Sequence, residues 1–365
     1  MAWLIIGLWL LGCPREATPP LVSKGARAQG GVSLGLFASE PDYNYEKLLN
    51  EIVMHHAQRV QLVVPFYLDN VTSHDMQLLA GHSPSQKNIE RTLQQAQGLG
   101  LEIQILPILR LKNRSANQWR GVLSPAEGSE RFFDAYERVL TPLAKLAGQY
   151  NVKSFVVGSE LLSLEHERAL WARLIAGVRT VYSGQLLYAA NWDQIRGPDF
   201  WDLLDGVGVS AYFEFELPQN GPRIPSIKKQ WGVVVQELHR IKAMTGKPVV
   251  LTEVGYPSQV SAAEMPWNET AHNDIDLKLQ ADLYAGFCLA MQASPEVIQE
   301  FFFWNWFGWG GPEDDSYTPR HKPAARIMSD CLKVFPPHGA QISARNRPQD
   351  TLSPPETSTS RALGR

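Results

Sequence analysis

The 365-residue sequence lacks an excess of charge of either sign. Its 34 Lys and Arg stand against 37 Asp and Glu, and charged residues make up only 19% of the chain. A protein that binds nucleic acid needs a basic surface for the phosphate backbone, so the composition excludes that class of partner. The first apolar run, Trp3–Leu11, has nine residues. That is too short for a membrane-spanning helix, which needs about 20.

Motifs that identify several classes of metal-dependent, nucleotide-binding and redox enzymes are absent as well. The sequence contains no HExxH, no CxxC pair and no Walker loop. Metal-dependent barrels of the amidohydrolase type need His-x-His after the first strand, but Val32–Ser39 contains no His. His55 and His56 fall in a helical pattern and are predicted to lie at the surface. None of these motifs therefore points to a metal ion or an organic cofactor.

The two ends of the chain differ in composition from the middle. Trp3–Leu11 has the length of the apolar segment of a signal peptide, and it ends at Leu10-Leu11-Gly12-Cys13, which resembles a bacterial lipobox. We expect export to the cell envelope or periplasm as a lipoprotein anchored through a lipidated Cys13, or secretion. The lack of Lys or Arg before the run counts against this expectation, and the alternatives are a chance apolar start or a misassigned initiator Met. Residues 14–29 are predicted to be a linker, and residues 336–365, rich in Pro, Ser, Thr and Arg, a disordered tail.

Two further cysteines each lie in a helical pattern. Cys288 and Cys331 have no metal-ligand spacing and no neighbouring His, so two buried, inert thiols are the favoured interpretation. In an exported protein, a disulfide is the alternative if the two helices are neighbours.

Between residues 30 and 335, short β-branched apolar runs alternate with amphipathic stretches. Runs that are apolar on both faces indicate a parallel sheet covered on each side. The predicted strands are Val32–Phe37, Val60–Pro65, Glu102–Ile108, Val152–Val157, Leu186–Ala190, Gly206–Ala211, Pro248–Thr252 and Val297–Phe303. The predicted helices are Glu46–Ala57, Asn88–Leu99, Arg131–Gln149, Glu167–Tyr182, a brief one around Asp199–Leu204, Ile227–Thr245, Asp276–Ala293 and Lys322–Leu332.

Eight βα units in about 300 residues predict a single closed (β/α)8 barrel of the α/β class, the TIM barrel, as one catalytic domain over residues 30–335. The alternative fold is a doubly wound open sheet. Such a sheet usually carries a glycine fingerprint after its first strand, where this chain has Ala38-Ser39-Glu40-Pro41-Asp42. The barrel is therefore favoured.

Two glutamates stand where an apolar strand ends. Glu160 closes the fourth run, and Glu253 closes the seventh. A carboxylate at such a position is costly unless it is paired, hydrogen-bonded or used. Since the C-terminal strand ends of a barrel form its active site, we expect both side chains to reach over one cavity. For either residue alone, a rim salt bridge or a charge at a helix N-terminus is the structural alternative.

Two facing carboxylates supply what cleavage of a glycosidic bond requires. One protonates the leaving oxygen, and the other attacks the sugar or activates water. A separation of about 5–5.5 Å predicts retention of anomeric configuration, and about 6.5–9.5 Å predicts inversion. Two other functions remain open: a non-catalytic envelope lipoprotein that binds polysaccharide, and a barrel whose Glu pair binds a metal, with Asp193 as the only near further ligand.

The chain is rich in aromatic residues, with 11 Trp, 11 Tyr and 14 Phe. Sugar rings stack their C–H faces on indole, so four Trp near strand ends are candidate platforms: Trp192, Trp304, Trp306 and Trp309. Trp309 and Trp267 are equally well explained by loop packing. Tyr212, which closes the sixth run, is expected to hydrogen-bond the seventh-strand carboxylate, with an ordinary rim tyrosine as the structural alternative. Arg110 and Asn191 are candidates for binding hydroxyls, with an ion pair and a turn cap as their structural alternatives.

These strand-end segments resemble glycoside hydrolase family 113. The similar segments are Gly158-Ser159-Glu160-Leu161, Ala190-Asn191-Trp192-Asp193, Ser210-Ala211-Tyr212, Thr252-Glu253-Val254-Gly255-Tyr256 and Tyr317-Thr318-Pro319-Arg320-His321-Lys322-Pro323-Ala324. They follow the family's order along the chain, over the whole of the predicted barrel.

The resemblance implies a retaining β-mannanase that acts on β-1,4-linked mannose chains by double displacement, with Glu160 as acid/base and Glu253 as nucleophile. It also implies that Tyr212 orients Glu253 and that Trp304 forms the floor of the subsite for the attacked sugar. One position departs from the wider clan, in which an Asn before the fourth-strand Glu contacts the sugar 2-hydroxyl. Here that residue is Ser159, whose shorter hydroxyl is expected to reach the sugar only through water.

Overall fold

The computed structural model describes residues 28–270 and 274–336. The predicted signal peptide with Cys13 lies outside the described residues, as do most of the predicted linker and all but the first residue of the predicted tail. Within the described ranges, no helix is both long enough and apolar enough to cross a membrane.

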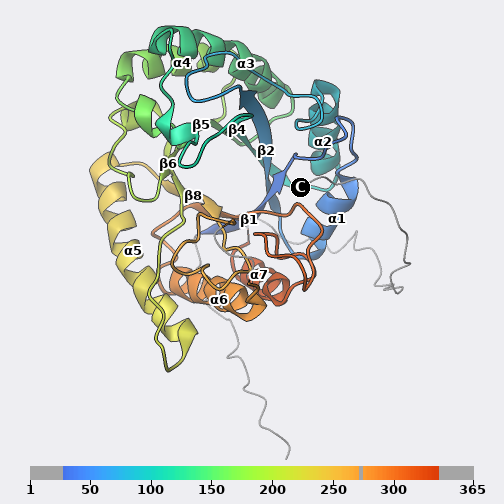
Figure 1. The fold of residues 1–365 in the computed structure, drawn as a ribbon, viewed down its shortest axis with the longest axis vertical. Coiled ribbons are helices and arrows are strands. Elements are labelled where there is room, and N and C mark those ends of the chain that lie inside the picture. The colour runs from blue at the N-terminus through green and yellow to red at the C-terminus, as the bar shows by residue number, and fades with distance from the viewer. Residues whose placement is uncertain (1–27, 271–273, 337–365) are drawn as a thin grey trace, which may run out of the picture.

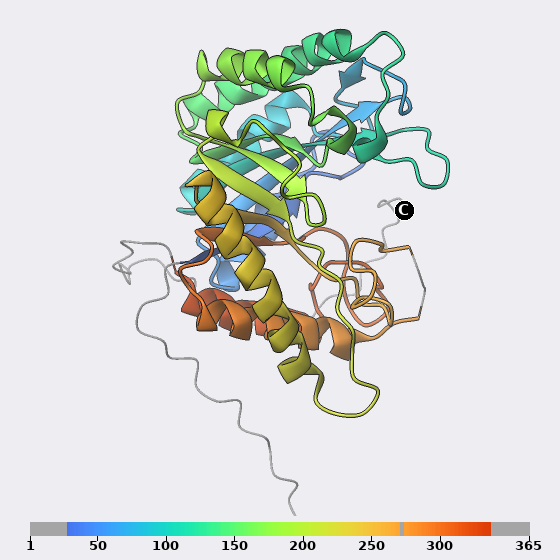
Figure 2. The same cartoon turned by 90° about the vertical axis from the view of Figure 1, so that its left-hand side faces the viewer.

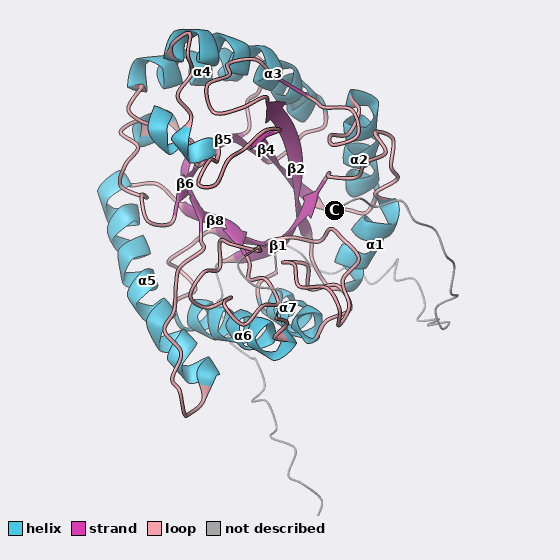
Figure 3. Cartoon of the chain, viewed as in Figure 1, coloured by secondary structure: helices cyan, strands magenta, loops and turns pink. Residues whose placement is uncertain are grey.

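In the described part of the chain, nine strands form one sheet, and eight of them are parallel and close into a barrel (Figures 1 and 3). Pairing of β1 with both β9 and β2 closes the ring, and the short β3 (Met76–Gln77) adds an antiparallel strand at the end of β2. The barrel strands are β1 (Gln29–Gly35), β2 (Arg59–Leu68), β4 (Glu102–Leu111), β5 (Ser154–Ser159), β6 (Gln185–Asn191), β7 (Gly206–Ser210), β8 (Val249–Val254) and β9 (Glu300–Phe303).

The helices surround this ring, as Figures 1 and 2 show. After β6 the chain makes only the short 3₁₀ turn Trp201–Leu203, where the sequence predicts a brief helix. The α-helices are α1 (Glu46–Met54), α2 (Gln86–Gly98), α3 (Ser129–Gln149), α4 (Arg168–Arg179), α5 (Arg223–Thr245), α6 (Leu277–Ala293) and α7 (Pro323–Val334). The predicted (β/α)8 barrel is confirmed, and a closed ring excludes the open-sheet alternative.

Both faces of the barrel strands are buried, which explains their nearly continuous apolar runs. Every residue of β1 and β8 is buried. Because side chains alternate along a strand, they enter two separate cores. The outer core lies between strands and helices. The inner core fills the barrel and includes Val63, Leu106, Ile108, Val156, Leu187, Ala189, Val250 and Phe302.

A buried ion pair joins three strands at the N-terminal end of the barrel. The Arg59 guanidinium, only 2% exposed, lies 2.6 Å from the Glu300 carboxylate and 3.1 Å from that of Glu102. These residues begin β2, β9 and β4. Polar groups at this end of a (β/α)8 barrel serve stability, which leaves the C-terminal end for function.

A disulfide joins Cys288 in α6 to Cys331 in α7. The two helices pack side by side outside the barrel (Figure 1). The expectation of two inert thiols is therefore wrong. Helical periodicity identifies two helices, but it does not reveal that they are neighbours in space.

Two strand ends differ from the prediction in a way that matters for the site. The fourth strand is predicted at Val152–Val157, whereas β5 runs from Ser154 to Ser159. The seventh is predicted to end at Thr252, whereas β8 continues through Val254. Ser159 and Glu253 are polar yet buried, so an apolar pattern does not include them. The observed ends place both candidate glutamates at the barrel mouth.

Candidate active site

The two glutamates lie at the same end of the barrel. Glu160 directly follows β5, and Glu253 is the penultimate residue of β8. Both are buried, with 5% and 1% of their surface exposed. The Ser159 hydroxyl lies 3.5 Å from a Glu253 carboxylate oxygen, and Ser159 directly precedes Glu160 in the chain. The two carboxyl groups therefore share one buried site.

The backbone turns sharply at Glu160. Its φ angle is +54°, in the left-handed region that is unfavourable for a residue with a side chain. Its N–H donates to the Ala189 carbonyl at 2.8 Å, and the N–H of Leu161 donates to the Tyr188 hydroxyl at 2.9 Å. Both acceptors belong to β6, so the neighbouring strand fixes the direction in which Glu160 leaves the barrel wall.

A further buried carboxyl group, that of Glu165, supports this turn. The Tyr188 hydroxyl donates to Glu165 at 2.7 Å. Burial raises the pKa of Glu165 to about 7, although the hydrogen bond from Tyr188 acts in the opposite direction. Glu165 therefore keeps its proton in mildly acidic solution, and there it adds no negative charge beside Glu160.

Glu253 is surrounded by hydroxyl groups. Tyr212 donates to its Oε2 at 2.8 Å, as the sequence predicts, and Ser210 donates to Oε1 at 3.4 Å. Burial raises the pKa of Glu253 and the charge of Glu160 raises it further, while Arg120 and the two hydroxyl donors act to lower it. Hydrogen bonds to a carboxylate favour its ionised form, the form that a nucleophile needs.

Arg120 is a residue of the candidate site that the sequence does not point to. It lies in a 3₁₀ turn (Arg120–Val122) in the loop between β4 and α3. Its guanidinium contacts the Glu160 carboxylate at 2.6 Å and donates to the Ser159 carbonyl at 3.2 Å. No motif marks Arg120, since only the folded loop brings it over the end of β5.

The structure places Arg110, the arginine that the sequence favours, away from this contact. Its exposed guanidinium lies 5.3 Å from the centre of the Phe37 ring and 6.0 Å from that of Tyr67. These two aromatic residues lie near the ends of β1 and β2. Arg110 therefore belongs to an aromatic part of the rim.

Two of the candidate tryptophans lie in or against the inner cluster that contains Tyr212. Trp304, 8% exposed, belongs to the inner core together with Tyr212 and Tyr317, and Trp192 packs against that cluster. Trp192 is half-buried, and its ring lies 5.9 Å from that of Phe213. Both indoles are thus placed at the mouth of the barrel.

Trp306 lies outside the barrel wall, which corrects its selection as a sugar platform. Its ring is 2% exposed in the outer core, 4.8 Å from that of His55, and its N–H donates to Glu51 at 3.0 Å. Residues two apart share a face only within a strand. The strand ends at Phe303, so this rule does not hold beyond it.

Asn191, at the end of β6, makes a local contact. Its amide donates to the Asp193 carboxylate at 2.7 Å, which closes the turn after the strand. This contact is the capping alternative that the sequence left open.

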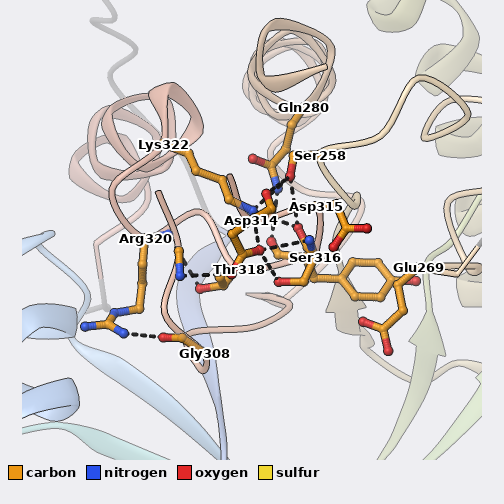
Figure 4. Close-up of polar contacts among 12 residues, drawn as sticks. Ser258, Glu269, Gln280, Gly308, Asp314, Asp315, Ser316, Thr318, Arg320 and Lys322 are labelled. Atoms are coloured by element: carbon orange, nitrogen blue, oxygen red, sulfur yellow. Dashed lines mark hydrogen bonds and ion pairs between the residues drawn. The ribbon is translucent and has the colours of Figure 1, made fainter. Parts of the chain in front are cut away.

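The segment Tyr317–Ala324 connects two loops at the barrel mouth (Figure 4). The fully buried Lys322 ammonium contacts Ser258 Oγ, Asp314 Oδ1 and the Ser316 carbonyl, each at 2.9 Å. Ser258 belongs to the loop after β8, and Asp314 and Ser316 belong to the loop after β9. Lys322 therefore holds these two loops together.

This connection also positions Tyr317. The Gln280 amide donates to the Tyr317 carbonyl at 3.1 Å, and the Tyr317 ring lies 5.8 Å from that of Tyr212. Because Tyr212 donates to Glu253, the side chains of Tyr317 and Tyr212 connect the two packed loops to the candidate nucleophile. The segment has a structural role that its sequence alone does not disclose.

The arrangement combines a carboxylate held by hydroxyl donors, a second carboxyl group beside an arginine, and indole rings at the same mouth. These are the groups that cleavage of a glycosidic bond requires. Among residues 28–270 and 274–336, no group of three or more His, Cys, Asp or Glu is placed to hold a metal ion.

Comparisons with known proteins agree with this chemistry. Residues 34–317 match the model of Glycoside Hydrolase Family 113, whereas no curated protein matches the sequence. A solved GH113 β-1,4-mannanase is similar to this chain at 23% identity and a TM-score of 0.73, over 84% of this chain and 99% of that one.

Two further solved structures share the fold. The GH113 β-mannanase AaManA from Alicyclobacillus acidocaldarius, in complex with ManMIm, has 22% identity and a TM-score of 0.73 over 85% of this chain and 100% of that one. GH5_18 from Streptomyces cattleya, in complex with GlcNAc, has 14% identity and a TM-score of 0.57 over 85% and 81%. At these identities the likeness demonstrates a common (β/α)8 fold.

Proposed function

Because the chain belongs to glycoside hydrolase family 113, we propose that it is a retaining β-mannanase that hydrolyses β-1,4-linked mannose chains. Family membership makes it a glycoside hydrolase with a carbohydrate substrate, and the mannan specificity and the mechanism are our proposal. The observation that carries the proposal is the buried site shared by Glu160 and Glu253 at one barrel mouth. The mannanases of the same family with the same fold support mannan as the substrate.

The different surroundings of the two carboxyl groups support different roles. Glu253 accepts hydrogen bonds from Tyr212 and Ser210, which orient it and favour the ionised form of a nucleophile. Glu160 contacts Arg120, whose positive charge stabilises the carboxylate that remains after Glu160 has given up its proton. We therefore assign Glu253 as nucleophile and Glu160 as acid/base.

The proposed reaction has two displacements. In the first, Glu253 bonds to the anomeric carbon while the bond to the leaving oxygen breaks and Glu160 donates its proton to that oxygen. In the second, water attacks the same carbon, Glu160 accepts the proton of the water, and the bond to Glu253 breaks. Each displacement inverts the carbon once, so the product keeps the configuration of the substrate.

Side chains around the two glutamates are proposed to hold the attacked sugar. Trp304 lies in the cluster with Tyr212, so its indole is suited to form the floor under that sugar. Trp192 provides a second ring at the mouth. The Ser159 hydroxyl, close to Glu253, is placed for a hydrogen bond near the reacting carbon.

The function is tested by incubating the purified protein with β-1,4-mannan, β-1,4-glucan and β-1,4-xylan and following the products by proton NMR. We expect manno-oligosaccharides, with the β-anomer formed first. Cleavage of another glycan without cleavage of mannan would refute the substrate. Initial release of the α-anomer would refute the retaining mechanism.

We also propose that the protein is exported, with residues 1–13 as the signal and Cys13 as the lipidation site. The Cys288–Cys331 disulfide supports export, because disulfides form and persist mainly in oxidising compartments.

Replacing Tyr212 by phenylalanine is expected to lower kcat/KM about 10- to 100-fold, since a hydrogen bond to a charged group contributes roughly 1.5–3 kcal/mol. The Tyr212 hydroxyl lowers the pKa of Glu253, so its removal raises that pKa. Because the nucleophile must be ionised, the acidic limb of the kcat/KM profile should move to higher pH.

The matched control for this variant is Tyr284→Phe. The buried Tyr284 hydroxyl has no hydrogen-bond partner within the described residues, so its loss should leave the pH profile in place. An unshifted acidic limb in Tyr212→Phe would contradict the role of Tyr212.

A further inference from the structure

Trp267 is half exposed although its indole is held in place. It lies in the loop between β8 and α6, and 50% of its surface is exposed. Its indole N–H donates to Glu214, in the loop after β7, at 3.0 Å. Burying an indole is strongly favourable, so a ring that is fixed by its N–H while half of it remains in water is positioned to receive another apolar surface.

The backbone beside Trp267 is connected to the active site. The Pro266 carbonyl accepts a hydrogen bond from the buried Tyr317 hydroxyl at 2.7 Å. The Tyr317 ring lies 5.8 Å from that of Tyr212, which in turn donates to Glu253 at 2.8 Å. A continuous series of contacts thus leads from the proposed nucleophile to the residue before Trp267, which places Trp267 at the rim of the same mouth.

Hydrogen bonds hold the described part of the loop on both sides of Trp267. The Phe215 N–H donates to the Ala263 carbonyl at 2.7 Å, which joins the loops after β7 and β8. The Asn268 side chain accepts from the backbone N–H and the hydroxyl of Thr270, at 3.1 and 3.0 Å. A ring on such a loop binds a ligand with little further loss of conformational entropy.

We propose that Trp267 is the stacking platform of a sugar-binding subsite beyond the one in which the bond is broken. The C–H face of a pyranose matches the exposed indole, and the Glu214 carboxylate at the edge of the ring accepts hydrogen bonds from sugar hydroxyls. This inference rests on the proposed function and narrows its substrate to chains of several β-linked sugars.

A polar hollow lies among the loops after β2 and β4, on the opposite side of the ring from β8. In the eight-strand ring β4 lies across from β8, so the loop after β4 faces the loop that carries Trp267. The hollow has a volume of about 440 Å³ and is lined by Asn70, Lys112, Asn113, Arg114, Ser115 and Gln118.

The kinetic test compares a long and a short substrate, mannohexaose and an aryl β-mannoside. In Trp267→Ala the ratio of their kcat/KM values should fall about tenfold, because an aromatic stacking contact contributes roughly 1–1.5 kcal/mol. Trp267→Phe, which keeps a ring, should stay within about twofold of the wild-type ratio. Val260→Ala is the matched control, since Val260 is also 50% exposed on the same loop.

A ratio that changes less than twofold in Trp267→Ala, or that falls equally in Val260→Ala, would overturn the subsite. Calorimetric titration of Glu253→Ala and of the Glu253→Ala, Trp267→Ala double variant separates this inference from the mannanase proposal. Hexasaccharides of β-1,4-linked mannose, glucose and xylose serve as ligands. The double variant should bind the preferred one about tenfold more weakly, whichever sugar that is. Equal binding by both variants, or no binding of any hexasaccharide, would refute the stacking role.

Discussion

Replacing Glu253 by alanine is expected to lower kcat at least about 10⁴-fold, on mannan oligosaccharides and on activated aryl β-mannosides alike. The nucleophile forms the bond to the anomeric carbon in the first step, so even a good leaving group cannot restore the rate. The measurement is steady-state kinetics on both substrate types.

Two controls distinguish lost chemistry from lost structure. Glu264→Ala removes an exposed carboxyl group from the loop after β8 and should retain wild-type activity. Burial raises the pKa of Glu253 in the folded protein above the value of about 4.3 that a glutamate has in the unfolded chain. The free energy of unfolding therefore falls as the pH rises above this value, because the folded state must then ionise a buried carboxyl group. Glu253→Gln should therefore melt at a higher temperature than wild type at pH 8, with a smaller difference at pH 5. Near wild-type activity of a folded Glu253→Ala on both substrates would end the assignment.

For Glu160→Ala, we expect a loss that depends on the leaving group. General acid catalysis contributes about 10²- to 10⁴-fold, so kcat/KM for mannan oligosaccharides should fall by about 10³. For a dinitrophenyl β-mannoside, whose leaving group needs no proton, kcat/KM should fall by less than about tenfold. The slow second step should then produce a burst of released phenol.

Added azide provides a second readout for the same variant. Azide attacks the glycosyl-enzyme without a general base, so it should accelerate turnover and release β-mannosyl azide. Equal losses of kcat/KM on good and poor leaving groups would show that Glu160 is not the acid. An α-configured azide product would refute the covalent intermediate on Glu253.

The sequence is sufficient to predict the barrel because a parallel strand is buried on both faces. Its apolar runs are therefore nearly continuous, and their alternation with amphipathic stretches is visible without a structure. Glu160 and Glu253 are detectable for the same reason. A carboxyl group at the end of an apolar strand conflicts with burial, and such a conflict indicates a functional position.

Other parts of the site could not be predicted in this way. Arg120 lies on an irregular loop without periodicity, and its contact with Glu160 exists only because that loop folds over the end of β5. Trp306 follows the end of β9, where strand alternation no longer determines which face a side chain occupies. The hydrogen-bond partners of Lys322 lie on two different loops, so they become its neighbours only in the folded barrel.

By itself, the sequence determined the order of strands and helices, the closed barrel and the two acidic residues at its mouth, because burial and periodicity are local properties of the chain. Only the tertiary structure decided that Arg120 contacts Glu160, that Tyr317 packs on Tyr212, and that Cys288 meets Cys331. Each of these contacts joins loops or helices that are distant in the chain. Their relative placement depends on the packing of the whole barrel, which no local pattern records.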